Sequence, residues 1–161
     1  MIVQSLRLGE IDVSEDRLIT MERPVLGFEK YKQFCLVEVE EFKPFLWLQS
    51  VDEPSISFLV VNPKLFMTDY KIEINSKEIA ELKINNVNSV ETYVVVTLAD
   101  KAENITANMQ GPILINTENK LGKQLVLVNT EYDVKYHFMQ YLPKEDISSE
   151  TKEEIATPIE V

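Results

Sequence analysis

Few residues in this chain of 161 have the chemistry that catalysis requires. His137 is the only histidine and Cys35 is the only cysteine. A histidine acts as a general base beside a nucleophile that it can activate, and no Gly-x-Ser-x-Gly elbow presents a serine here. One imidazole without a second histidine or a cysteine ligand does not predict a zinc site. We therefore interpret His137 as structural or solvent-exposed, and keep a small hydrolase that uses it as an alternative.

The cysteine and the glycines exclude further kinds of site. Cys35 alternates with Val37 and Val39 in an apolar run, which predicts a buried thiol that acts as a small hydrophobic residue. Without a second cysteine there is no internal disulfide, as is usual in a reducing compartment. The four glycines are isolated, so the chain has neither a phosphate loop nor a dinucleotide fingerprint. No cofactor, metal or small-molecule substrate is expected.

Two groups of carboxylates are the candidate partner-binding residues. Glu38, Glu40 and Glu41 lie at the end of a predicted strand, and Asp52 and Glu53 lie in the next turn. Paired carboxylates can serve acid–base chemistry, but nothing in this pattern indicates the apolar cleft that such chemistry needs. We interpret both groups as solvated turns that can steer a basic partner, over a Debye length of about 8 Å at physiological salt.

The overall charge narrows the choice of partner. The net charge is -11, from 27 acidic and 16 basic residues. Nucleic acids and anionic membranes are also negative, so direct binding to either is not expected. The N-terminal sequence lacks the charged and apolar regions of a signal peptide, and no apolar run approaches the roughly 20 residues that span a bilayer. These features predict a cytoplasmic protein whose partners are basic or apolar.

The elements that must position these residues are mostly short strands. The length and the 45% apolar content suit one domain. Short apolar runs between turn residues predict a mainly β fold, a single antiparallel β-barrel or sandwich-like domain with one or two short helices. A helix is predicted at 76–83 with Asn75 or Ser76 as its N-cap, and single helical turns at 63–70 and 104–109. The predicted strands are 2–8, 17–21, 33–39, 45–51, 56–61, 92–98, 112–116 and 124–128.

Several of these strands are apolar on both faces. The strand 45–51 holds the only tryptophan, Trp47, and the turn at 52–55 predicts an antiparallel hairpin, with Pro54 fixing φ and Asp52 bonding its own backbone. Such strands need cover on both sides, and closing a barrel covers one side only. The outer face must pack against the helix and loops, or remain as an apolar patch for a partner.

The composition changes after residue 142. The segment 143–161 has six acidic residues, two lysines and no aromatic residue. We therefore predict a folded domain over 1–142 and an acidic, mobile C-terminal tail over 143–161.

Short segments that occur in a fixed order between Met1 and Phe138 carry a family resemblance. They are Pro24-Val-Leu-Gly-Phe-Glu29, Trp47-Leu-Gln-Ser-Val-Asp-Glu-Pro54, Asn62-Pro63, Thr106-Ala-Asn-Met-Gln-Gly-Pro-Ile-Leu-Ile-Asn116 and Gly122-Lys-Gln-Leu-Val-Leu127. Together they make the chain similar to the FliW flagellar assembly factor family. That resemblance implies a non-enzymatic, cytoplasmic bacterial protein that binds flagellin. It also implies binding to the RNA-binding translational repressor CsrA, which relieves the repression of flagellin synthesis.

Two alternatives belong to other classes. One is a general peptide-binding chaperone unrelated to flagella. The other is the small hydrolase, which requires His137 within hydrogen-bond reach of a serine and an acid.

Overall fold

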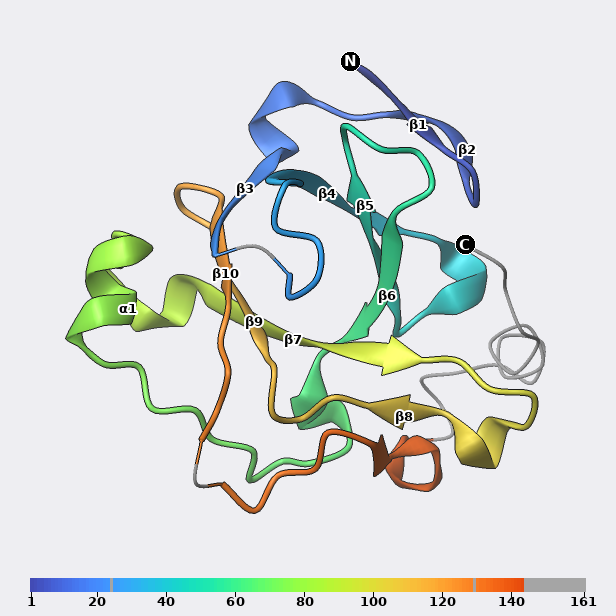
Figure 1. Ribbon diagram of the computed structural model, residues 1–161, viewed down its shortest axis with the longest axis vertical. Coiled ribbons are helices and arrows are strands. Elements are labelled where there is room, and N and C mark those ends of the chain that lie inside the picture. The colour runs from blue at the N-terminus through green and yellow to red at the C-terminus, as the bar shows by residue number, and fades with distance from the viewer. Residues whose placement is uncertain (24, 129, 144–161) are drawn as a thin grey trace.

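Seven strands close into a barrel in the computed structural model, which describes residues 1–143 apart from Pro24 and Asn129 (Figure 1). In order around the barrel the strands are β3 (Ile19–Arg23), β4 (Gln33–Glu38), β5 (Leu46–Ser50), β6 (Ser57–Val61), β7 (Val90–Thr97), β9 (Ile113–Asn116) and β10 (Leu121–Gln124). All neighbouring strands are antiparallel except β3 and β10, whose parallel pairing closes the ring. The predicted mainly antiparallel β-barrel is thus confirmed. From residue 144 on, the predicted tail lies outside the described residues.

The remaining elements lie around the barrel. The hairpin of β1 (Ile2–Ser5) and β2 (Gly9–Asp12) is a separate two-stranded sheet. β8 (Thr106–Ala107) extends the barrel sheet beyond β7, and β11 (Tyr136–His137) pairs with β8. The helix α1 (Ser76–Glu81) begins after Asn75, which is its N-cap as predicted.

Three sequence-based predictions were wrong in position or type. The predicted strand 2–8 ends at Ser5, and the chain turns into β2 at Gly9, which has φ of +77°. The predicted helical turn at 104–109 contains the two-residue strand β8 instead, and a 3-10 turn precedes it at Ala102–Asn104. The last barrel strand begins at Leu121 instead of residue 124, because the turn before it closes at Lys120, where φ is +62° and the N–H donates to the Asn116 carbonyl at 2.8 Å. The residue types around this turn do not predict a left-handed backbone conformation at a lysine.

The β5–β6 hairpin is confirmed, but its turn is held differently from the prediction. Ser50 Oγ accepts a hydrogen bond from the Glu53 N–H at 3.0 Å, and the Glu53 carboxylate accepts one from the Ser55 N–H at 3.2 Å. Among the described residues, these side chains take the role that we expected of Asp52.

The barrel interior is a core made from alternate residues of its strands. It takes apolar side chains from six of the seven strands, including Ile19, Phe34, Leu48 and Val60. The seventh strand, β10, contributes Gly122, where an added Cβ would lie 2.7 Å from Met21 Sδ. A side chain at this position would therefore compete for space with the core.

The outer face is covered by the chain itself. Side chains of the β1–β2 hairpin region, Val3 and Val13, pack with Cys35 on β4. Leu82, directly after α1, packs with Leu114 on β9. Over β5 to β8, the outer cluster contains Trp47 with the aromatic residues Phe45, Phe66 and Phe138. The loops and the helix thus supply most of the cover that the doubly apolar strands require.

Replacing Trp47 by alanine tests this outer cluster. Trp47 is only 1% exposed, so we expect Trp47→Ala to lower the free energy of unfolding by about 3–5 kcal/mol. Chemical denaturation measures the change, and Tyr141→Ala at a residue that is 53% exposed is the matched control with a smaller effect. A midpoint that hardly moves in Trp47→Ala would contradict a core role for Trp47.

Candidate functional site

The described part of the chain gives His137 no catalytic surroundings. It lies on β11 opposite Thr106, and its side chain is exposed. In the described part of the chain, no hydrogen bond or ion pair joins this imidazole to a serine or to a carboxylate, so it lacks the partners that the hydrolase alternative needs. Within the same residues, no cluster of three or more histidine, cysteine, aspartate or glutamate side chains could hold a metal ion.

Cys35 is the buried thiol that the sequence predicted. Its side chain on β4 is fully buried and packs with Val3 and Val13. Burial raises the pKa of the thiol, because the thiolate loses hydration there, and this disfavours nucleophilic chemistry.

The first carboxylate group is partly neutralised by a lysine. Lys43 Nζ lies 3.1 Å from Glu38 Oε1 and 2.9 Å from Glu40 Oε2. Hydrogen bonds to both carboxylates raise the pKa of Lys43, and the bond to Glu40 has a larger effect than the bond to Glu38. Glu41 lies in the same 3-10 turn, Glu40–Phe42, and is exposed. The group is therefore a solvated acidic patch with one cation in its centre.

The two carboxylate groups do not form one surface. Glu38 pairs with Leu46 at the start of β5, whereas Asp52 and Glu53 follow the end of β5. About six residues of extended chain separate them, or roughly 20 Å. The two groups therefore form separate acidic patches at opposite ends of β5.

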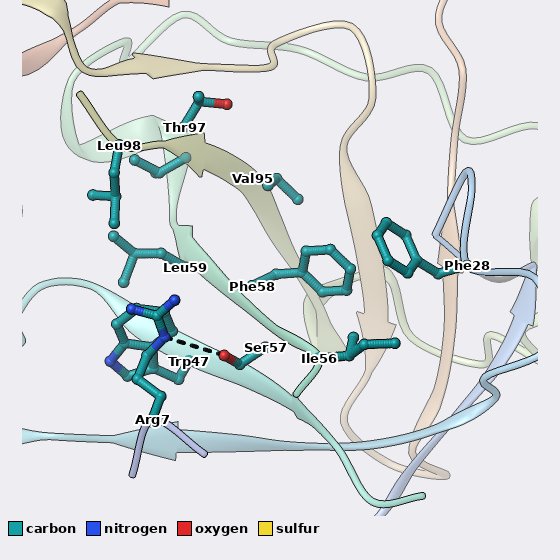
Figure 2. Close-up of a pocket in the computed structure, with 11 residues that line it drawn as sticks. Arg7, Phe28, Trp47, Ile56, Ser57, Phe58, Leu59, Val95, Thr97 and Leu98 are labelled. Atoms are coloured by element: carbon teal, nitrogen blue, oxygen red, sulfur yellow. Dashed lines mark hydrogen bonds between the residues drawn. The ribbon is translucent and has the colours of Figure 1, made fainter. Parts of the chain in front are cut away.

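A groove opens in the barrel wall between β6 and β7. The sequence did not predict this groove. These strands pair only at Val60 with Val95 and at Val61 with Val94. Beyond these pairs they diverge, and a cavity of about 400 Å³ lies between them (Figure 2). Its apolar lining comes from both faces of the wall, with Phe28, Phe58 and Val95 from the interior side and Trp47, Leu59 and Val96 from the outer side.

Arg7 lies at one end of this groove, and Phe28 lies at the other (Figure 2). The guanidinium of Arg7 stacks on Trp47 with 4.4 Å between Cζ and the ring centre, and Nε donates to Ser57 Oγ at 3.3 Å. Its Nη1 is buried without an acceptor among the described residues. Burial lowers the pKa of Arg7, although a guanidinium stays charged at neutral pH.

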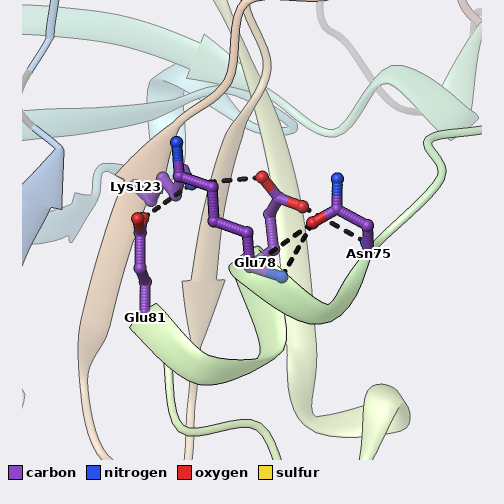
Figure 3. Close-up of polar contacts among 5 residues, drawn as sticks. Asn75, Glu78, Glu81 and Lys123 are labelled. Carbon is purple, nitrogen blue, oxygen red and sulfur yellow. Dashed lines mark hydrogen bonds and ion pairs between the residues drawn. The ribbon is translucent and has the colours of Figure 1, made fainter.

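A buried ion pair joins α1 to the barrel (Figure 3). Lys123 on β10 is 4% exposed, and its Nζ lies 3.1 Å from Glu78 Oε1 and 2.7 Å from Glu81 Oε2. The other oxygen of Glu78 accepts the N–H of Asn75 at 3.2 Å, which completes a capping box at the start of the helix. A helix of six residues is too short to be stable alone, so these contacts hold it in place.

The chain matches known proteins along nearly all of the described region. The family model described as FliW protein matches residues 2–138. The chain belongs to the FliW family. A flagellar assembly factor FliW from Geobacter sulfurreducens is 40% identical over 138 residues, which is 86% of this chain and 86% of that protein. One from Alkaliphilus metalliredigens is 33% identical over 145 residues, covering 89% and 90% of the two chains.

The solved structures agree with these sequence relatives. A crystal structure of the flagellar assembly factor FliW superimposes with a TM-score of 0.80 at 34% identity, over 89% of this chain and 98% of that one. The predicted family resemblance is therefore confirmed, as is the expectation of a non-enzymatic protein of flagellum biogenesis. In the described residues, no helix has the length and apolar character to cross a membrane.

The buried ion pair predicts a large effect of one substitution. Lys123→Met leaves Glu78 buried without its counter-charge, so we expect the free energy of unfolding to fall by about 3–5 kcal/mol. Adding Glu78→Gln to Lys123→Met should restore part of this loss, since the orphaned charge is then removed. Lys77→Met, at an exposed lysine of the same helix, is the control. Equal midpoints for Lys123→Met and Lys77→Met would contradict the anchoring role.

The same contacts predict a pH dependence of stability. Burial alone raises the pKa of Glu78, but hydrogen bonds from Lys123 and from the Asn75 backbone outweigh it, so the folded pKa lies below its ordinary value. The stabilisation is then fully present above about pH 4.3, the unfolded pKa, and is lost as the pH falls through the folded value. Urea midpoints from pH 7 to pH 3 should fall more steeply in the wild type than in Glu78→Gln. Parallel curves would show that Glu78 does not contribute.

Proposed function

We propose that this FliW-family chain binds flagellin and antagonises the translational repressor CsrA by direct protein–protein contact in the cytoplasm. The match of residues 2–138 to the family model carries this proposal, because it covers the whole barrel and most of the segments that cover it. The relatives are flagellar assembly factors, and a factor that couples flagellin synthesis to flagellin export needs contact with both proteins.

The mechanism is partner exchange. Abundant unsecreted flagellin occupies the protein, and CsrA stays free to repress flagellin translation. When flagellin is exported, the protein is released and binds CsrA. Such a switch needs two affinities and changing concentrations, with no chemical step.

The charge of the chain fits CsrA as a partner. An RNA-binding protein presents a basic surface, and a chain with net charge -11 attracts it. Bound beside an RNA groove, the same negative charge repels phosphate without filling that groove. The acidic patch of Glu38, Glu40 and Glu41 is our candidate for the first contact.

The apolar groove between β6 and β7 is the one observation that favours a general peptide-binding chaperone instead. Co-purification from native cytoplasm separates the two functions. A chaperone retains many clients, whereas the proposed regulator retains two. Recovery of a broad set of unrelated proteins would replace our proposal by the chaperone.

Electrostatic steering of the CsrA encounter is the measurable consequence. Charges at the rim of an interface act mainly on association, so rising salt should slow association more than it speeds dissociation. Stopped-flow rates across a salt series measure this effect. Reversing Glu38, Glu40 and Glu41 to lysine should lower the association rate and flatten its salt dependence.

The second acidic group supplies the control for this experiment. Asp52→Lys with Glu53→Lys reverses charge at the opposite end of β5. A steep salt response that only this control removes would move the contact to that turn. A flat response in the wild type would remove steering altogether.

A further inference from the structure

The groove between β6 and β7 exposes two strand edges. On β6, Ser57, Phe58 and Leu59 belong to the strand, and among the described residues they pair only with β5. On β7, the pairing with β6 stops at Val95, while the strand itself continues to Thr97. In the part of the chain that the structure describes, no strand occupies the space between these edges. An edge of three residues is about 10 Å long and offers backbone groups to an added strand.

The side chains around the gap are less covered than their neighbours. Phe58 and Val95 face the interior, yet both are only half-buried, whereas Val60 beside them is fully buried. Phe28 closes the far end and makes an edge-to-face contact with Phe58 at 5.0 Å between ring centres. An extended segment placed here meets apolar side chains on both of its faces.

The groove favours apolar side chains in a bound segment, and Arg7 adds a preference for a negative charge. Its only side-chain partners in the described region are the Ser57 hydroxyl and the Trp47 ring, and no carboxylate pairs with it. A partly desolvated guanidinium with an unused donor binds a carboxylate strongly and in a defined geometry.

We propose that the groove binds an extended segment of a partner protein, which adds a short strand between β6 and β7 and places a carboxylate on Arg7. Main-chain hydrogen bonds to the open edges supply affinity, and the pockets on the two faces select apolar side chains. Arg7 fixes the register of the segment. This binding mode does not depend on flagellin or CsrA being the partner.

The probe for this groove is a labelled peptide with the sequence acetyl-Leu-Val-Leu-Glu-amide, titrated into the full chain. Two matched peptides accompany it, one with glutamine in place of the glutamate and one with an N-methylated central valine. We expect the parent peptide to bind and to shift the amide resonances of residues 57–59 and 96–98. The glutamine peptide should bind at least tenfold more weakly, and N-methylation should abolish binding by removing a strand hydrogen bond.

Substitution of Arg7 completes a double-mutant cycle. Arg7→Gln should lower the affinity for the parent peptide at least tenfold. The same variant should bind the glutamine peptide no more weakly than the wild type does. Arg17→Gln is the control, with the same change of charge at a residue outside the groove. The glutamine peptide on the wild type tests the same contact if Arg7→Gln does not fold.

Three outcomes would overturn the proposal. The first is absence of any shift at 57–59 and 96–98 with the parent peptide. The second is equal binding of the glutamate and glutamine peptides. The third is release of the chain's own residues 144–161 by the peptide, seen as changes in their resonances, which would make that segment the occupant instead of a partner.

Discussion

Strands that are apolar on both faces impose the main constraint on this molecule. Closing the barrel buries one face, and everything outside it then has to bury the other. The β1–β2 hairpin, the helix α1 and the loops around Phe66 and Phe138 each cover one sector. Because the cover is made from separate pieces, each needs its own attachment. For α1 that attachment is the pair of carboxylates on Lys123, which orients six residues of helix that have little stability alone.

The antiparallel β-barrel or sandwich class followed from short apolar runs between turn residues, and the irregular parts of the fold did not. The runs that became β4, β5 and β6 are short, apolar and separated by turn residues, so their positions were predicted, as was the antiparallel pairing of β5 with β6. β8 was mistaken for a helical turn, because a strand of two residues has no period to detect. The start of β10 depended on left-handed backbone at Lys120, which no local pattern announces. Parallel pairing of β3 with β10 joins distant segments and is invisible to local patterns.

The candidate surfaces divide in the same way. The acidic patches were predictable, since charge density is a property of composition. The groove was not, because it arises where two strands that could pair further instead diverge, and this is decided by the twist of the whole barrel. Arg7 is far from the β6–β7 edges in sequence, and only the fold brings it onto Trp47. Lys123 left no comparable trace, because it stands between Gly122 and Gln124 and just before the predicted strand 124–128.

The parallel seam between β3 and β10 also sets the order in which the molecule can be made. It pairs Thr20 with Leu121, about a hundred residues apart, so its loop-closure entropy is the largest among the barrel pairings. A chain leaving the ribosome can form the β4–β5–β6 meander as soon as those strands emerge. The barrel has to wait until β10 has cleared the exit tunnel. Until then the interior faces of β3 and β4 stay uncovered, and the nascent protein is an open sheet whose protection falls to the chaperones of the cell.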